Sequence, residues 1–349
     1  MRALLEFLQV VVYLLMLPAV AVLFLVAHTV VSIADLVLRL RTPADTPRVF
    51  VITGAAGGIG EGLALHYAGK GTTLCLTDKH EERLKLVADA CVSRRVCDQT
   101  CLVSVYTFRT RRGATVKTAS LDVTDAASME AWLHAIDNDT PVDVVIANAV
   151  RFHAPSSLAD ARFVVTTDSL PASQGICNDG SDAAGAARAV FAVNVDGVVN
   201  TVLPLLPAMR ARGRGRIAIM SSLASSAPLT RFPVYSASKA AVRAYGEALR
   251  GAVYRDGVRV NVVCPGYVVS NMTRATVAAG TVLPGLMATN AAVARIADGL
   301  ARDVPVVQFP FWLHTVFASA GRVAPPQLFH ACARRQRAFH GVNYLRAGE

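Results

Sequence analysis

The stretch RVFVITGAAGGIG, residues 48–60, decides the fold of this chain. It opens with β-branched and apolar residues that run up to Gly54, a pattern typical of a buried parallel strand. The helix-like segment GIGEGLALHYAGKG (58–71) follows at once. Backbone amides in such a turn can approach a pyrophosphate, and the N-terminus of the helix favours its negative charge. We therefore expect a dinucleotide-binding site around Gly54, Gly58 and Gly60.

Strand-like and helix-like segments continue to alternate beyond this turn. The strand TTLCLTD and the helix HEERLKLVADA come next, and VDVVIANA, GRIAIMSS and RVNVVCPG are later strand-like runs. This order predicts an α/β fold, a doubly wound parallel sheet of the Rossmann type flanked by helices, over residues 48–300. Residues 91–112 and 151–182 show no clear period and are expected to be surface insertions.

The N-terminus is the most apolar part of the chain. Residues 7–34 contain no Asp, Glu, Lys or Arg, and about 20 apolar residues span a bilayer core as a helix. We expect residues 1–40 to form a transmembrane or membrane-embedded helix with its juxtamembrane linker. A signal peptide cleaved after Ala19–Ala21 is an alternative, and Pro18 leaves open a hairpin within one leaflet.

The charge balance is basic. The chain has 35 Lys and Arg against 25 Asp and Glu, and Arg39, Arg41 and Arg48 follow the apolar segment. Basic residues next to a membrane segment favour the cytosolic side, so we expect a domain facing the cytosol at the endoplasmic reticulum or a lipid-droplet surface, against anionic headgroups. No nucleic-acid-binding module is visible, so nucleic acid is not an expected partner.

Cysteines and sequons fit the same compartment. Seven cysteines in a chain of this length are not a disulfide framework. The spacing of Cys91, Cys97 and Cys101 matches no zinc pattern, so no metal site is expected. The sequons at Asn138 and Asn271 are expected to stay unglycosylated in the cytosol.

The tail, residues 301–349, combines aromatic and apolar residues with Arg and His. The run VPVVQFPFWLHTVFAS (304–319) is its most apolar part. This composition suits helices that lie on a membrane surface or shield an apolar tunnel. The alternative is a tail packed against the sheet.

The segment YSASK indicates the chemistry. It places Tyr235 and Lys239 four residues apart on one helix face, and Ser222 ends the strand GRIAIMSS. A phenol with a pKa near 10 is a weak base at neutral pH, and a neighbouring ammonium stabilises its phenolate. Ser222 can hold a substrate oxygen within reach of Tyr235. The pattern predicts proton transfer at an alcohol or carbonyl oxygen.

Together, the TGxxxGIG spacing from Thr53 to Gly60, the strand-end serine and YxxxK resemble the short-chain dehydrogenase/reductase family, over about residues 48–300. The resemblance implies an oxidoreductase. Asn194, in VNVDG, matches the family's asparagine that relays protons through water behind the lysine. Val150 stands where the family usually has glycine. The implied catalytic residues are Ser222, Tyr235, Lys239 and Asn194.

The cofactor residues follow from the glycine turn and from the resemblance. The expected set is Thr53, Gly54, Gly58, Ile59, Gly60, Asp78, Asp122, Val123, Asn148, Ala149, Tyr235, Lys239, Pro265, Gly266, Val268 and Ser270. Asp78 closes the second strand, where a carboxylate can bind the ribose hydroxyls and repel a 2′-phosphate. We therefore expect NAD rather than NADP, although Lys79 could meet a phosphate. A strand-end acid that caps the next helix is the alternative for Asp78.

Only the anchor and the tail indicate the substrate. A membrane-held enzyme gains most from a lipophilic substrate such as a retinoid, a steroid or a long-chain lipid. The chain resembles the membrane-bound retinol and 17β-hydroxysteroid dehydrogenase group. An NADPH-dependent reductase similar to 3-ketodihydrosphingosine reductase, and a catalytically idle membrane scaffold or lipid-binding protein, are the alternatives. The expected partners are a lipophilic small molecule and membrane lipid, and a homodimer is left open.

Overall fold

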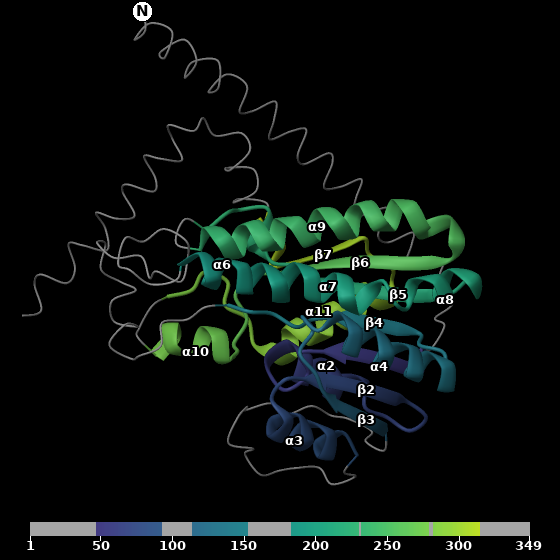
Figure 1. Ribbon diagram of the computed structural model, residues 1–349. Helices are drawn as coiled ribbons and strands as arrows, with labels where there is room; N and C mark the ends of the chain where they lie inside the picture. Colours follow the sequence, from purple (N-terminus) through teal and green to yellow (C-terminus); the bar gives the residue numbers. More distant parts are fainter. Residues whose placement is uncertain (1–46, 93–113, 153–182, 230–231, 279–281, 315–349) are drawn as a thin grey trace, which may run out of the picture. The chain divides into compact units, whose positions relative to one another are not determined.

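The computed structural model describes residues 47–92, 114–152, 183–229, 232–278 and 282–314 (Figure 1). The chain divides into two units, residues 1–45 and 46–349, and the described residues all belong to the second. The expected anchor, most of the two expected insertions and the tail from residue 315 lie outside the described residues.

The described residues form a seven-stranded sheet in which all strand pairs are parallel. Its order is β3-β2-β1-β4-β5-β6-β7, so the predicted doubly wound sheet is confirmed. The chain reverses direction across the sheet between β1 and β4, where folds of this kind bind ligands at the carboxyl ends of the strands. The strands are β1 Val49–Thr53, β2 Thr73–Asp78, β3 Thr115–Ser120, β4 Val144–Ala147, β5 Gly215–Met220, β6 Val258–Pro265 and β7 Val306–Phe309.

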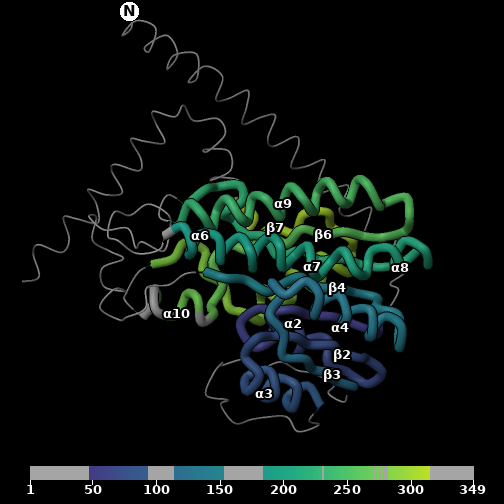
Figure 2. Tube along the Cα trace, in the orientation of Figure 1, coloured from purple at the N-terminus to yellow at the C-terminus, as the bar shows by residue number. Residues whose placement is uncertain are grey.

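Helices cover both faces of the sheet (Figure 2). On one face Leu63, Leu84 and Ile296 pack against the strands, and on the other face Met129 and Val202 do so. The central strand β1 is buried along its whole length because both of its faces are covered. The helices are α2 Gly58–Tyr67, α3 Glu81–Val92, α4 Ala126–Asp139, α6 Ala183–Phe191, α7 Gly197–Val202, α8 Leu206–Ala211, α9 Pro233–Val253, α10 Asn271–Ala278 and α11 Thr289–Ala301.

The two edge strands were not predicted. β3 has the sequence TVKTAS, and its side chains are exposed or half-buried, so it carries no strong apolar signal. β7 lies in the tail, where the sequence suggested membrane-surface helices. For residues 306–309 that helical interpretation is wrong, and the alternative of packing against the sheet applies: β7 pairs with β6. The sheet therefore continues past residue 300.

One stretch among the described residues, Ala184–Ala211, is long and apolar enough to cross a membrane. It comprises α6, a π-helical turn (Ala192–Asp196), α7 and α8. Val198, Val202 and Leu205 within it belong to the buried core on the α4 and α9 face of the sheet. Packing in the domain interior therefore accounts for part of its apolar character, while Phe191 and Leu203 are exposed.

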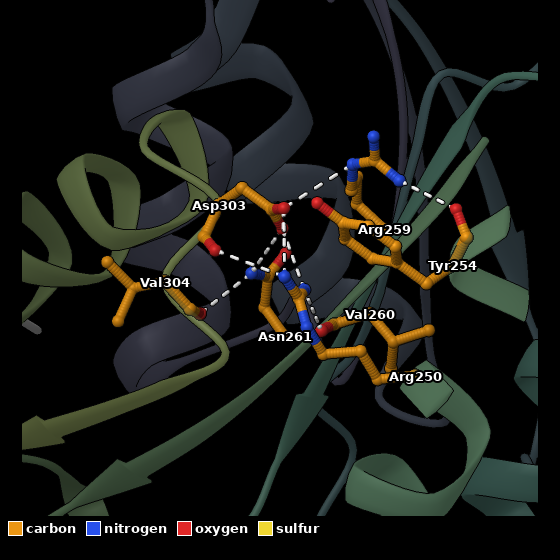
Figure 3. A network of polar contacts seen from close by, with 7 residues as sticks. All are labelled: Arg250, Tyr254, Arg259, Val260, Asn261, Asp303 and Val304. Atoms are coloured by element: carbon orange, nitrogen blue, oxygen red, sulfur yellow. Dashed lines mark hydrogen bonds and ion pairs between the residues drawn. The ribbon is translucent and has the colours of Figure 1, made fainter. Parts of the chain in front are cut away.

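A polar network joins the amino ends of β6 and β7 (Figure 3). Asp303 precedes β7, and its carboxylate accepts two hydrogen bonds from Arg250 of α9, at 2.8 and 2.9 Å. Asn261 donates to the same carboxylate at 3.2 Å, and Arg259 forms an ion pair with it at 3.4 Å. The Arg259 guanidinium also lies 4.1 Å from the centroid of the Tyr254 ring. These contacts tie α9, β6 and the start of β7 together.

Candidate active site at the carboxyl ends of the strands

The ends of β1 and β4 are joined by side chains of the expected cofactor set. The Thr53 hydroxyl accepts hydrogen bonds from the backbone amides of Asn148 and Ala149, at 3.0 and 3.1 Å. The Asn148 side chain in turn donates to the carbonyls of Thr53 and Gly54, both at 3.0 Å. Thr53 and Asn148 therefore fix the geometry of the glycine turn.

Glycine is required at three positions of this turn. Gly54 and Gly58 have φ angles of +64° and +57°, which side chains rarely adopt. A Cβ on Gly60 would lie 2.1 Å from the Gly54 carbonyl oxygen. Ile59 lies between them in the first turn of α2. Gly57, the residue before α2, supplies no side-chain cap, so first-turn amides of the helix can receive an anionic group. The turn fits a dinucleotide pyrophosphate.

Asp78 links the second strand to the glycine turn. Its carboxylate accepts hydrogen bonds from the backbone amides of Ala56, at 3.1 Å, and His80, at 3.0 Å. The bond to His80 is a local turn contact just before α3, so the capping alternative stays a prediction. Each carboxylate oxygen can accept a further hydrogen bond, so binding of ribose hydroxyls is compatible with both contacts.

Asp122 and Val123 lie between β3 and α4. The Asp122 carboxylate accepts hydrogen bonds from the amide and the hydroxyl of Thr124, which lower its pKa. The Val123 side chain is buried in the core, where a Cβ on Gly197 would lie 2.5 Å from it. Val123 can therefore face a cofactor only through its backbone.

Lys239 is buried on α9, with 1% of its surface exposed. Its ammonium donates to the Met220 carbonyl at 2.9 Å and lies 5.8 Å from the centroid of the Tyr235 ring. Burial lowers the pKa of Lys239 to about 8. The ammonium is therefore beside the phenol but bonded to the end of β5.

Tyr235 and Ser222 are neighbours. Burial raises the pKa of Tyr235 to about 12, and a hydrogen bond from Ser222 acts in the opposite direction. The Ser222 hydroxyl also accepts from the Ala224 amide at 3.2 Å. Without further positive charge the phenol is thus a weaker acid than free tyrosine, so ionisation near neutral pH needs a cation close to it.

Asn194 lies in the π-helical turn and is fully buried. Its side chain accepts a hydrogen bond from the Arg151 amide at 2.7 Å and donates to the Arg151 carbonyl at 3.1 Å. It also donates to the Ser238 hydroxyl at 3.0 Å. These contacts hold the segment after β4 against α9. The expected proton relay behind Lys239 stays a prediction.

The segment after β6 is held by hydrogen bonds that the sequence did not indicate. The Gly266 amide donates to the Phe309 carbonyl at 2.7 Å, which places Pro265 and Gly266 against the end of β7. The Thr273 hydroxyl donates to the Val268 carbonyl and accepts from the Ser270 amide. Ser270 also faces the glycine turn: its Cβ would be 3.5 Å from a Cβ on Gly58.

Three aromatic residues beside Tyr235 were missed. The Phe152 ring meets the Tyr235 ring edge-on, with centroids 5.2 Å apart, and the Phe232 ring lies 4.7 Å from Phe152. Tyr267 is close enough to raise the pKa of Tyr235. Phe152 follows Val150, which is exposed at the position where a glycine was expected. The valine in place of the expected glycine, two residues before Phe152, was the only sequence signal for this cluster.

Comparisons with known proteins agree with this geometry. The family described as short chain dehydrogenase matches residues 48–280. An uncharacterized oxidoreductase of Myxococcus xanthus (strain DK1622) is 30% identical over 291 residues, which cover 83% of this chain and 98% of the relative. The oxidoreductase UcpA of Escherichia coli (strain K12) is 30% identical over 230 residues, which cover 64% of this chain and 70% of UcpA.

Solved structures share the fold. An oxidoreductase of the short chain dehydrogenase/reductase family from Burkholderia thailandensis has a TM-score of 0.56 at 26% identity, with 80% of this chain and 99% of that chain covered. A short-chain dehydrogenase from Sphingobium yanoikuyae in complex with NADPH has a TM-score of 0.54 at 19% identity, covering 86% of this chain and 98% of that chain. This chain belongs to the short-chain dehydrogenase family and is an oxidoreductase that acts on CH–OH groups with NAD or NADP.

Proposed function

We propose that this protein interconverts an alcohol and a carbonyl on a lipophilic substrate, with NAD(H) as cofactor and Tyr235 as the acid/base. The observation that carries the proposal is that Tyr235 lies next to both Ser222, which lowers its pKa, and the Phe152 ring, which meets it edge-on. A polar group for the reacting oxygen thus lies beside an apolar surface for the rest of the substrate.

The proposed chemistry follows from these side chains. A nicotinamide dinucleotide held at the glycine turn would supply the acceptor for the hydride of the carbinol carbon during oxidation. The Tyr235 phenolate takes the hydroxyl proton, and Ser222 donates a hydrogen bond to the same oxygen. Lys239 contributes positive charge next to the phenol, which favours the phenolate. In the reverse direction Tyr235 returns the proton to the oxygen of the carbonyl.

The raised pKa of Tyr235 shows how much the site must stabilise the phenolate for the phenol to act as a base near neutral pH. A pKa of about 12 is about five units above neutral pH, and each unit corresponds to about 1.4 kcal/mol. The Lys239 ammonium and the positive charge of an oxidised nicotinamide are the two cations available to lower it. We therefore expect the phenol to become an effective base only when the cofactor is bound.

Asp78 supports NAD over NADP. Its carboxylate ends β2, and a 2′-phosphate beside it would meet like charge. The short-chain dehydrogenase from Sphingobium, in contrast, was solved in complex with NADPH. Lys79 and Arg151 both lower the pKa of Asp122 and therefore lie on this side of the site. NADP use would favour the reductase similar to 3-ketodihydrosphingosine reductase.

Membrane attachment and the substrate class rest on the sequence of residues 1–40. The uncharged segment of residues 7–34 supports an anchor that holds the domain in the cytosol, at the endoplasmic reticulum or a lipid droplet. A substrate dissolved in the bilayer, such as a retinoid, a steroid or a long-chain lipid, would then reach the site directly. Within the family we place the chain with the membrane-bound retinol and 17β-hydroxysteroid dehydrogenases.

The test is turnover by the full chain in detergent micelles. Retinol, a 17β-hydroxysteroid and a long-chain secondary alcohol are each supplied with NAD and, separately, with NADP. We expect NADH formation with at least one of the three alcohols and slower formation of NADPH. Cofactor binding without turnover of any alcohol or of the matching ketones would instead support the idle scaffold.

A further inference from the structure

Phe152 and Phe232 form an aromatic pair next to Tyr235, and they come from different parts of the chain. Phe152 lies beyond the end of β4, and Phe232 directly precedes α9. Their centroids are 4.7 Å apart with planes at 56°, and Phe152 stands nearly perpendicular to the Tyr235 ring, at 87°. Both phenylalanine rings are half-buried, so part of each ring surface is open to a ligand.

Hydrogen bonds fix the backbone on both sides of this pair. Arg151, next to Phe152, has its amide and its carbonyl bound by the Asn194 side chain. The Phe232 carbonyl accepts from the amide of Ser236 at 2.9 Å and from its hydroxyl at 2.8 Å. The rings are therefore held in place before a substrate arrives, which lowers the entropic cost of binding.

Polar groups also lie next to Tyr235, whose ring the Phe152 ring meets edge-on. Ser222 is close enough to Tyr235 to lower the pKa of the phenol, and the Lys239 ammonium binds the Met220 carbonyl. A substrate that places its oxygen between Ser222 and Tyr235 would therefore extend its carbon substituent toward the aromatic rings. Aromatic rings favour contact with flat apolar groups.

We propose that Phe152 and Phe232 determine substrate specificity by contacting an apolar, ring-bearing substituent on the carbinol carbon. This inference rests on Tyr235 as the acid/base of the proposed function. It assigns the selective contact to two residues of the described domain, independently of the anchor and the tail.

The experiment compares 1-phenylethanol with 2-propanol, two secondary alcohols that differ in one ring. In Phe152→Ala and in Phe232→Ala we expect kcat/KM for 1-phenylethanol to fall about tenfold or more, chiefly through KM, while kcat/KM for 2-propanol changes by less than about threefold. Phe152→Leu should fall between the wild type and Phe152→Ala. The double variant should lose less than the product of the single losses because the two rings touch.

Tyr67→Leu is the matched control. Tyr67 stacks on Phe50 with centroids 4.3 Å apart, in a pair that does not contact Tyr235. We expect this variant to lose thermal stability and to keep the wild-type ratio of kcat/KM for the two alcohols. If Tyr67→Leu changes the ratio as much as Phe152→Ala does, the ratio reports general loosening and the inference is wrong.

A binding measurement separates this inference from the proposed function. Saturation-transfer NMR detects 1-phenylethanol on the NADH-bound enzyme without any turnover. We expect the signal in wild type and in Tyr235→Phe, and its loss in the Phe152→Ala, Phe232→Ala double variant. Equal loss of activity toward both alcohols, or unchanged binding in the double variant, would overturn the specificity role and leave Tyr235 as the acid/base. Full turnover by Tyr235→Phe would instead remove the proposed function.

Discussion

The two ends of the sheet differ in how their charged side chains are paired. At the amino ends of β6 and β7, the Asp303 carboxylate is bonded to Arg250 and Asn261 and paired with Arg259, so opposite charges meet within the chain (Figure 3). At the carboxyl ends, the buried ammonium of Lys239 has one neutral hydrogen-bond partner, Met220, and no acidic partner among the described residues.

This difference in charge pairing indicates which charged groups stabilise the fold and which serve the proposed chemistry. A buried charge is costly unless it is paired. The Asp303 network contains its own counter-charges, and Asn261 Oδ1 is its buried side-chain atom without a hydrogen bond. The site leaves Lys239 uncompensated beside a phenol that is harder to ionise than free tyrosine. The paired charges at the amino end therefore stabilise the fold, and we propose that the unpaired charge at the carboxyl end serves the chemistry at Tyr235.

Among the variants that test this contrast, the largest effect is expected for Lys239→Met, which removes the uncompensated charge. Loss of the ammonium should raise the pKa of Tyr235 further, so we expect kcat/KM to fall about 10²–10³-fold. The melting temperature should hold or rise, because a side chain of similar length without charge is easier to bury. Kinetics and thermal melts on one preparation test both. A destabilised variant would contradict the contrast between the two ends.

Asp303→Asn should show the reverse behaviour. It leaves Arg250 and Arg259 without their counter-charge, and we expect a loss of about 2–4 kcal/mol in the free energy of unfolding. Asn tolerates the φ of 54° that Asp303 adopts, so the backbone is not an added cause. Urea unfolding measures the loss, and kcat at a temperature where the variant is folded should match wild type. A stable variant with reduced kcat would reverse our assignment.

His314 follows β7 at the carboxyl end of the sheet, and its two buried ring nitrogens have no side-chain hydrogen bond within the described part of the chain. Burial lowers its pKa to about 4, and Arg243 adds to this, while backbone groups of Cys264 and Phe309 act against it. The unfolded chain binds a proton near pH 6.5 and the folded chain only near 4. Its contribution to stability is therefore complete above pH 6.5 and is lost as the pH falls toward 4.

His314→Leu isolates this contribution. Between pH 7 and pH 5 the wild type should lose about 2 kcal/mol of unfolding free energy that the variant does not lose. Urea unfolding at both pH values gives the difference between the two proteins, in which other titrating groups cancel. Parallel pH dependence in both proteins would show that the imidazole titrates normally in the folded state.

The smallest effect is expected at Asp78. Asp78→Asn keeps an oxygen that can accept from the Ala56 amide but loses the negative charge. We expect the preference for NAD over NADP, as the ratio of kcat/KM, to fall about tenfold with little change in melting temperature. Asp78→Ala should also raise the KM for NAD. An unchanged preference in both variants would remove Asp78 from cofactor discrimination.

The sequence predicted those parts of the site whose residues lie close together along the chain. The glycine turn, the strand-end Ser222 and the pair Tyr235 and Lys239 each lie within one strand, turn or helix, so local pattern was enough to place them. The central strands carry continuous apolar runs because both faces are buried. β3 and β7 were missed since edge strands carry weaker patterns: β3 is polar, and β7 lies in a tail with aromatic residues.

Contacts between distant segments could not be read from the sequence. Two examples are the hydrogen bonds between Asn194 and Arg151 and the contact between the Phe152 and Phe232 rings. Both depend on how the π-helical turn and α9 pack beside the end of β4. The hydrogen bond from the Lys239 ammonium to the Met220 carbonyl, at the end of β5, also depends on the packing of α9 against the sheet. Side-chain identity limits which contacts are possible, and only the folded chain selects among them.

The most direct test of the account is the turnover of Tyr235→Phe, measured together with its affinity for NADH. The variant removes one hydroxyl and keeps the ring that Phe152 contacts. We predict a fall in kcat of about 10²–10⁴-fold, with NADH affinity and melting temperature close to wild type. Turnover at the wild-type rate would show that a different group moves the proton, and the proposed chemistry would be wrong.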